Sequence, residues 1–154
     1  MTSLQKKSIF WFEDDAHSLT IYIEELRKKY ELRIGAHLEL IKQTPPRPFD
    51  LLLLDLMIHN ISLDFEEFKE VYNINYKDIH WTQTGVEFLR LLRKGKYESY
   101  GFSSSIPVIV ATALVDNSIK ENVGELGVND FLIKPYTLDK LEASINKIFK
   151  QAND

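Results

Sequence analysis

Short apolar runs, each bounded by charged or turn-forming residues, recur along the chain. Residues 8–12 are almost entirely apolar and end at Glu13-Asp14-Asp15, as a buried strand ends at a charged loop. Four consecutive leucines lie between Asp50 and Asp55, and residues 107–111 and 131–133 form further apolar runs. We expect a strand at each of these runs and a shorter one at 31–35. Runs buried on both faces are typical of the centre of a parallel sheet.

Between these runs, apolar residues recur at spacings of three and four, which predicts amphipathic helices. Thr137 is predicted to cap the last of them. The apolar stripes are Leu19, Tyr22, Ile23, Leu26 and Tyr30; Val86, Leu89 and Leu92; Ile119, Val123 and Leu126; and Leu138, Leu141, Ile145 and Ile148. A short helix is expected at 37–42 as well. Five alternations of strand and helix predict an α/β fold whose parallel sheet carries helices on both faces.

Two segments interrupt this alternation. The first, about 58–83, is aromatic and acidic, and a connection this long in a compact domain is usually functional, disordered or structured in its own right. The second, 94–105, contains two glycines and three consecutive serines and is predicted to be an exposed linker.

Composition narrows the functional classes. The 154 residues suit one domain, 1–154, and the net charge of −4 argues against nucleic-acid binding. Cysteine is absent, which excludes disulfides and thiol chemistry. No segment is apolar enough to span a membrane or act as a signal peptide, so we expect a cytoplasmic protein. The basic clusters at 27–29 and around Arg90, Arg93, Lys94 and Lys96 are interpreted as solvated helix faces.

Chemistry-bearing residues lie where the predicted strands end. In an open parallel sheet, sites form at the carboxyl ends of the strands, and four strands each supply polar groups there. These groups are Glu13, Asp14, Asp55, Thr112 and Lys134. Crowded carboxylates repel one another unless a cation or protons offset them, and Mg2+ prefers oxygen ligands. The sequence therefore predicts a site that holds Mg2+ and a phosphoryl group, in which Asp55 attacks phosphorus to form an acyl phosphate.

Four motifs in order carry a resemblance to a known family. They are Phe12-Glu13-Asp14-Asp15, Asp50 to Met57, Ile106 to Ala113, and Gly127 to Pro135. Together they resemble the successive motifs of the response-regulator receiver family over nearly the whole chain. The resemblance implies a flavodoxin-like fold with strand order 2-1-3-4-5. It also implies that Asp55 accepts a phosphoryl group from a phosphohistidine on a sensor histidine kinase or histidine phosphotransfer protein, and so switches binding of a downstream protein target.

The family's roles transfer to matching positions. Glu13, Asp14, Asp55 and the backbone carbonyl of Met57 would bind Mg2+, and Thr112 and Lys134 would contact the phosphoryl group. Phe131 occupies the position of the aromatic switch residue, although a purely structural core aromatic is the alternative there. The Lys134-Pro135 peptide corresponds to a step that is often cis in the family.

Other functions remain open at this stage. One is a degenerate receiver that acts as a phosphorylation-independent interaction scaffold. An aspartate-nucleophile phosphatase is disfavoured because Met57 stands where its second aspartate would be, so we expect a signalling phosphoacceptor rather than an enzyme. The pattern does not separate a relay intermediate from an endpoint that binds a target.

The chain departs from the family directly after Asp55. The expected proline is missing, and the resemblance resumes only at Thr84-Gly85, so residues of about 58–83 form an insertion between the third strand and its helix. We hypothesise that this insertion forms a helical flap beside the site, so that deleting about 62–76 changes phosphotransfer or partner binding; packing without regulatory effect is the alternative. Met57 and Leu114, both apolar, replace residues that flank the attacking water, which predicts slow loss of the phosphoryl group.

Overall fold

A computed structural model gives the fold of the chain. The residues that it describes are 5–13, 16–35, 45, 47–56, 84–113 and 117–152. The expected helix at 37–42 and the insertion at about 58–83 fall outside these residues, so the prediction of a flap remains a prediction.

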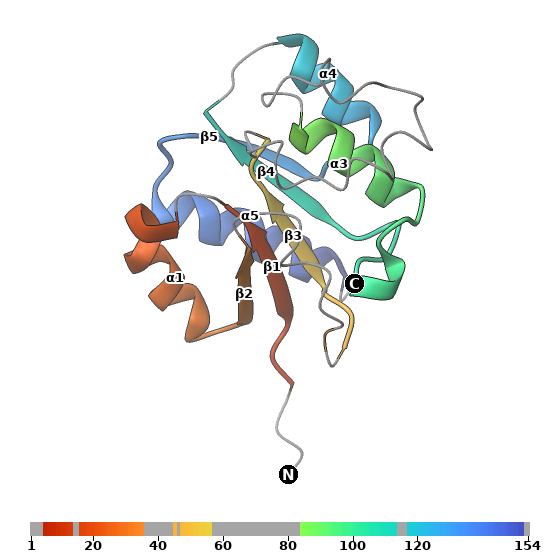
Figure 1. The fold of residues 1–154 in the computed structure, drawn as a ribbon. Helices are drawn as coiled ribbons and strands as arrows, with labels where there is room; N and C mark the ends of the chain where they lie inside the picture. Colours follow the sequence, from red (N-terminus) through yellow and green to blue (C-terminus); the bar gives the residue numbers. More distant parts are fainter. Residues whose placement is uncertain are drawn as a thin grey trace.

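A parallel five-stranded sheet forms the centre of the fold (Figure 1). Its strand order is β2-β1-β3-β4-β5, which confirms the predicted flavodoxin-like topology. The strands are β1 (Ser8–Phe12), β2 (Glu31–Gly35), β3 (Leu51–Leu54), β4 (Val108–Thr112) and β5 (Asp130–Ile133). The described helices are α1 (Thr20–Arg27), α3 (Thr84–Arg93), α4 (Asn117–Glu125) and α5 (Leu138–Ala152), with 3-10 turns η1 (Ala16–Leu19) and η6 (Glu98–Tyr100).

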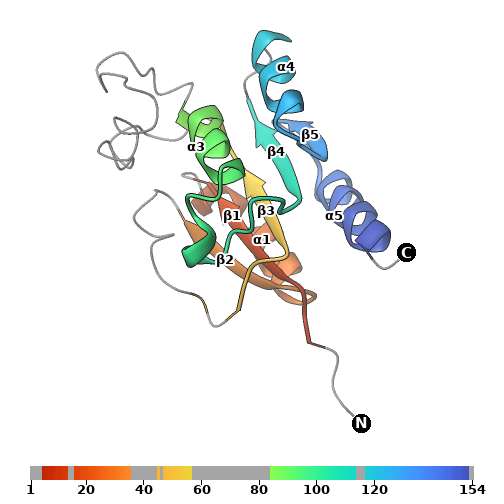
Figure 2. The ribbon, with the colours of Figure 1, turned by 90° about the vertical axis from the view of Figure 1, so that its right-hand side faces the viewer.

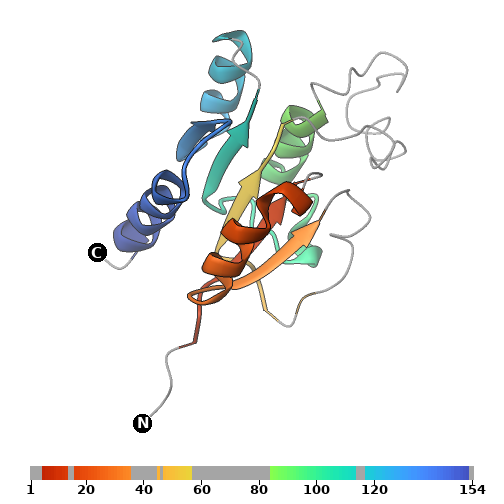
Figure 3. The same cartoon turned by 90° about the vertical axis from the view of Figure 1, so that its left-hand side faces the viewer.

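Helices cover both faces of the sheet because successive strand residues point to opposite sides. On β1, Phe10 and Phe12 face α3 and α4, whereas Ile9 and Trp11 face α1 and α5. Figures 2 and 3 show the two helical layers from either side of the sheet. All residues of β1, β3 and β4 are buried, as expected for central strands enclosed between two layers. The cap predicted at Thr137 is confirmed, because its Oγ1 accepts a hydrogen bond from the Lys140 N–H at 3.2 Å.

The segment 94–105 is not the exposed linker that its glycines and serines suggested. Tyr97 and Phe102 are almost completely buried. The Phe102 ring stacks on Phe49 with centroids 5.0 Å apart, and it meets Phe10 edge-on at 5.2 Å. The prediction was wrong because two large aromatic rings between the turn residues stabilise packing against the core.

The interpretation of the second basic cluster as a solvated face was wrong for Arg93. Its guanidinium donates hydrogen bonds to the carbonyl oxygens of Leu126, Ser104, Ile106 and Gly127, at distances of 2.7 to 3.2 Å. Burial lowers the pKa of this guanidinium. Arg93 therefore joins the end of α3 to the turn that follows α4 and to the segment that leads into β4.

Among the described residues, no helix has the length and apolar character that crossing a membrane requires.

Candidate functional site

The carboxyl ends of four strands meet at one edge of the sheet and determine the backbone of the site. Glu13 follows β1 and donates its N–H to the Gly35 carbonyl at the end of β2, at 3.0 Å. Asp55 follows β3 and donates its N–H to the Phe12 carbonyl, also at 3.0 Å. The sheet ladder thus extends by one residue past the regular strands and holds both acidic residues side by side.

Lys134 reaches this edge from the strand at the far side of β4. It directly follows β5, and its N–H donates to the Thr112 carbonyl at 2.9 Å. The Lys134-Pro135 peptide is cis, as the resemblance implied. Thr112 ends β4, and its side chain is fully buried.

The side chains of Glu13, Asp55 and Lys134 form one cluster, called the acidic cluster below. Lys134 Nζ lies 2.7 Å from Glu13 Oε2 and 2.9 Å from Asp55 Oδ2. The carboxylate side chains are 1% and 5% exposed, whereas the lysine side chain is 25% exposed. Two buried carboxylates therefore contact the same ammonium in a region of low dielectric constant, where electrostatic interactions are strong.

Burial and charge act in opposite directions on the pKa of Lys134. Burial lowers the pKa, but the hydrogen bonds and negative charges of Glu13 and Asp55 together raise it above the ordinary value. Lys134 therefore remains protonated at neutral pH and supplies a fixed positive charge.

Gly85 brings α3 against the backbone of the acidic cluster. Its N–H donates to the Leu56 carbonyl at 3.1 Å. A Cβ atom at this position would lie 2.4 Å from Leu56 Cα and 3.0 Å from the Asp55 carbonyl oxygen. Only glycine permits so close an approach of a helix to the Asp55-Leu56 backbone.

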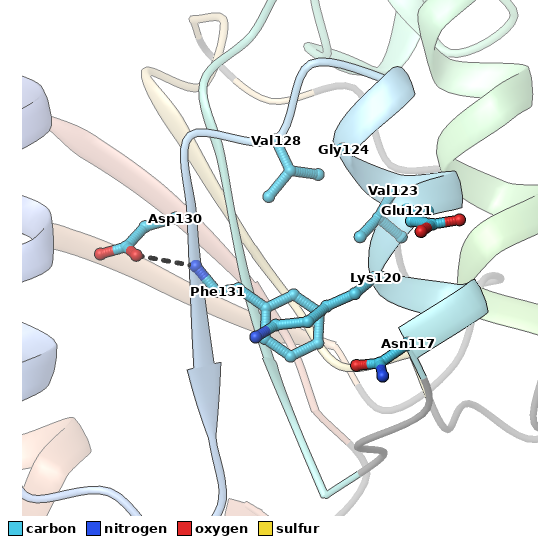
Figure 4. A pocket seen from close by; sticks show the side chains of 8 residues that line it. All are labelled: Asn117, Lys120, Glu121, Val123, Gly124, Val128, Asp130 and Phe131. Carbon is cyan, nitrogen blue, oxygen red and sulfur yellow. Dashed lines mark hydrogen bonds between the residues drawn. The ribbon is translucent and has the colours of Figure 1, made fainter.

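Phe131 lies in a different environment. Its half-buried ring borders a cavity of about 470 Å³ between β5 and α4, shown in Figure 4. Lys120 of α4 lies over the ring, with its Nζ 5.3 Å from the ring centroid. Phe131 also packs against the residues of the α3 and α4 face, so it combines a partly exposed ring with a core contact.

The donor set suits a hard cation in part. Glu13 and Asp55 supply buried carboxylate oxygens, which are the ligands that Mg2+ prefers. Two further expected ligands, Asp14 and the Met57 carbonyl, lie outside the described residues, as does Leu114. Within the described ranges, no group of three or more His, Cys, Asp or Glu side chains could hold a metal ion.

Two residues near the site are not among the site residues that the sequence predicts. One is Gly85, and a glycine near the start of a predicted helix is a usable signal that the helix packs closely against another part of the backbone. Tyr136, two residues after Lys134, is buried, and its hydroxyl has no hydrogen-bond partner among the described residues. No sequence signal distinguishes it from an ordinary core aromatic.

Comparison with known proteins shows a relative that matches most of the chain. The chain is 31% identical over 147 residues to the transcriptional regulatory protein CrdR of Helicobacter pylori. The match covers 94% of this chain but only 55% of that protein, so the chain spans about half of its length. No protein-family model matches the chain.

Solved structures share the fold. One is a CheY-like response regulator receiver domain protein from Methanospirillum hungatei, with a TM-score of 0.62, 19% identity and coverage of 97% of this chain and 98% of that one. Another is the BeF3-activated receiver domain of DrrB from Thermotoga maritima, with a TM-score of 0.63 and 20% identity, covering 95% and 99% of the two chains.

Proposed function

Because the chain belongs to the receiver-domain family of response regulators, we propose that it is a phosphoacceptor of two-component signalling whose phosphorylated residue is Asp55. The observation that carries the proposal is the acidic cluster. The buried Asp55 carboxylate directly follows the central strand β3, and both it and the buried Glu13 carboxylate lie within hydrogen-bonding distance of the protonated Lys134 ammonium.

The proposed reaction transfers a phosphoryl group from a phosphohistidine. A carboxylate oxygen of Asp55 attacks phosphorus, the P–N bond breaks, and its electron pair stays on the imidazole nitrogen, which takes a proton from solvent. Lys134 is placed to pair with a phosphoryl oxygen as charge develops there. Thr112, at the end of β4, is proposed to donate a hydrogen bond to another phosphoryl oxygen.

A divalent cation would be held on the side of Glu13 and Asp55, with Asp14 and the Met57 carbonyl as the remaining expected ligands. When bound, Mg2+ would neutralise phosphoryl oxygens as they approach the carboxylates. The protein's own contribution is to keep Glu13 buried and to fix Asp55 through its backbone hydrogen bond to β1.

The proposed partners follow from this chemistry. A histidine kinase or a histidine phosphotransfer protein would supply the phosphoryl group, and a downstream protein would respond to the phosphorylated state. CrdR is named a transcriptional regulatory protein, but that name describes a protein about twice as long as the match. We therefore propose a change in partner binding as the output and assign no target.

Intact-mass measurement tests the proposal. Wild-type protein incubated with Mg2+ and a small phosphodonor such as phosphoramidate should gain one phosphoryl group, and Asp55→Asn should gain none. The matched control is Asp50→Asn, which removes the aspartate at the opposite end of β3 and should leave the adduct intact. Asp50 accepts a hydrogen bond from the Ser8 N–H at 2.7 Å and belongs to the other edge of the sheet.

Beryllofluoride provides a second measurement that needs no phosphodonor. If wild type forms no adduct and binds no beryllofluoride with Mg2+, the phosphoacceptor proposal is wrong, and a phosphorylation-independent interaction scaffold takes its place.

A further inference from the structure

Tyr136 is fixed next to the acidic cluster by contacts on its backbone and its ring. It follows the cis Lys134-Pro135 peptide. The Tyr22 hydroxyl of α1 donates a hydrogen bond to the Tyr136 carbonyl at 2.8 Å, and the two ring centroids are 6.0 Å apart. Its ring belongs to the core between the sheet and helices α1 and α5.

The hydroxyl group of this ring has no partner in the described part of the chain. Only 7% of the residue is exposed, and its hydroxyl oxygen is buried. Buried hydroxyls are normally hydrogen-bonded, because an unsatisfied one destabilises the folded state. Phenylalanine would fill the same space without this cost. A tyrosine here therefore points to a hydrogen-bond acceptor other than the described residues, and a bound ligand is one such acceptor.

The surroundings of the hydroxyl indicate what that acceptor is. Burial, followed by the negative charges of Glu13 and Asp55, raises the pKa of Tyr136 above its ordinary value. The phenol therefore keeps its proton at neutral pH and can act as a donor. A cavity of about 410 Å³ is lined by Tyr136 together with Lys134, Ala113 and Ser18, and it provides room for ligand or solvent oxygens beside the cluster.

We propose that the Tyr136 hydroxyl is a further hydrogen-bond donor of the phosphoacceptor site and donates to an oxygen of the group that fills the acidic cluster. The acceptor is either a water of the hydrated Mg2+ ion or an oxygen of the phosphoryl group. The inference rests on the proposed function. It assigns to this chain a site residue that is not part of the set of Glu13, Asp14, Asp55, Thr112 and Lys134.

The test compares Tyr136→Phe with Tyr30→Phe. The Tyr30 hydroxyl donates to Asn146 Oδ1 at 3.0 Å near the start of β2, at the opposite edge of the sheet, so it is a satisfied buried hydroxyl remote from the acidic cluster. Calorimetric titration measures the affinity for Mg2+ alone and for beryllofluoride in the presence of Mg2+. Thermal unfolding without ligands measures stability.

Tyr136→Phe should bind about threefold to tenfold more weakly, the effect of one hydrogen bond, while its Tm stays equal or rises because an unsatisfied hydroxyl is removed. Tyr30→Phe should show the reverse, a lower Tm with unchanged affinities. A purely structural role for Tyr136 does not produce this combination. Weaker binding of Mg2+ alone identifies a water as the acceptor, and weaker binding of beryllofluoride only identifies a phosphoryl oxygen.

Unchanged affinities in Tyr136→Phe, measured beside a wild type that binds both ligands, would overturn the inference and leave the proposed function standing. A wild type that binds neither beryllofluoride nor a phosphoryl group would overturn both.

Discussion

The two edges of the sheet carry the same combination of charges and differ in burial. At the carboxyl edge, Lys134 pairs with Glu13 and Asp55. At the amino edge, Arg47 pairs with Glu31 at 2.9 Å and lies 3.8 Å from Asp50. Among the described residues, each edge therefore has a cluster in which one cation pairs with two carboxylates at strand ends.

The cations are equally accessible, with 25% of the Lys134 side chain and 24% of the Arg47 side chain exposed. The carboxylates at the two edges differ in exposure. Those of Glu31 and Asp50 are 52% and 32% exposed, and water screens their charges. Those of Glu13 and Asp55 are 1% and 5% exposed and have little water to solvate them. The same charges thus form solvated ion pairs at one edge and a buried ion cluster at the other.

The two cations also differ in geometry. Arg47 donates to the Glu31 carboxylate through both Nε and Nη2 and also donates to the Lys6 carbonyl. It therefore connects the start of β2 to the segment that precedes β1. Lys134 is a point charge that can shift between oxygens without breaking a fork of hydrogen bonds. A lysine therefore suits the proposed function, in which a phosphoryl oxygen replaces one of its carboxylate partners.

Lys134→Met should have the largest effect. It removes the ammonium that lies 2.7 and 2.9 Å from two buried carboxylates, and removing one partner of a buried ion pair costs about 3–5 kcal/mol of unfolding free energy. Urea unfolding at neutral pH measures this loss. A variant as stable as wild type would show that the acidic cluster is solvated like the amino edge.

Alkaline pH provides a second readout for the same variant. The folded-state pKa of Lys134 is raised above its ordinary value of 10.5, with burial opposing and Glu13 and Asp55 outweighing it. The stabilisation by Lys134 is therefore complete below pH 10.5 and is lost as the pH rises through the folded-state pKa. The stability difference between wild type and Lys134→Met should shrink over that interval, and a constant difference would contradict the assignment.

Gly85→Ala should have the second largest effect. The added Cβ would lie 2.4 Å from Leu56 Cα, so the start of α3 and the Asp55-Leu56 backbone must separate. We expect a loss of about 1–3 kcal/mol together with slower phosphorylation of Asp55. Gly124→Ala, in α4 with no atom within 4 Å of its added Cβ, is the matched control and should retain both properties. Equal phosphorylation rates in the two variants would show that the position of α3 does not affect the acidic cluster.

Arg47→Met should have the smallest effect, below about 1 kcal/mol, because its carboxylate partners are solvated. Unfolding at low and high salt measures it, and the small difference from wild type should decrease further as salt screens the charges. Arg93→Met is the comparison, because Arg93 is half-buried and donates to four carbonyl groups. If Arg47→Met destabilises the protein as much as Arg93→Met, exposure is not what separates the two edges.

Sequence periodicity was sufficient for the sheet. The four leucines between Asp50 and Asp55 mark a strand enclosed on both faces, and the ends of such strands determine which polar residues share an edge. The contact of Lys134 with Glu13 and Asp55 follows from that rule, because the parallel register places the residues after β1, β3 and β5 at the same edge of the sheet.

Contacts between segments far apart in the sequence were not predictable in the same way. Arg93 resembles its solvated neighbours in sequence, and only the fold brings the carbonyl groups of 104–106 and 126–127 around it. Phe102 lies among glycine and serine residues that indicate a surface turn, yet its ring packs against the rings of Phe10 and Phe49 in the core. The orphan hydroxyl of Tyr136 is likewise a property of its surroundings and not of its neighbours in the sequence.

The hydrogen bond between the Gly85 N–H and the Leu56 carbonyl, 3.1 Å long, affects how the length of the connection between β3 and α3 can change. Leu56 and Gly85 are thus held next to each other, so the two ends of the connection between β3 and α3 lie side by side. The entropy of closing a loop changes by only about 0.6 kcal/mol for each doubling of its length. A flexible segment joined to these two anchors could therefore vary in length at small thermodynamic cost, which makes this connection a point for grafting a reporter beside Asp55, the proposed phosphoacceptor.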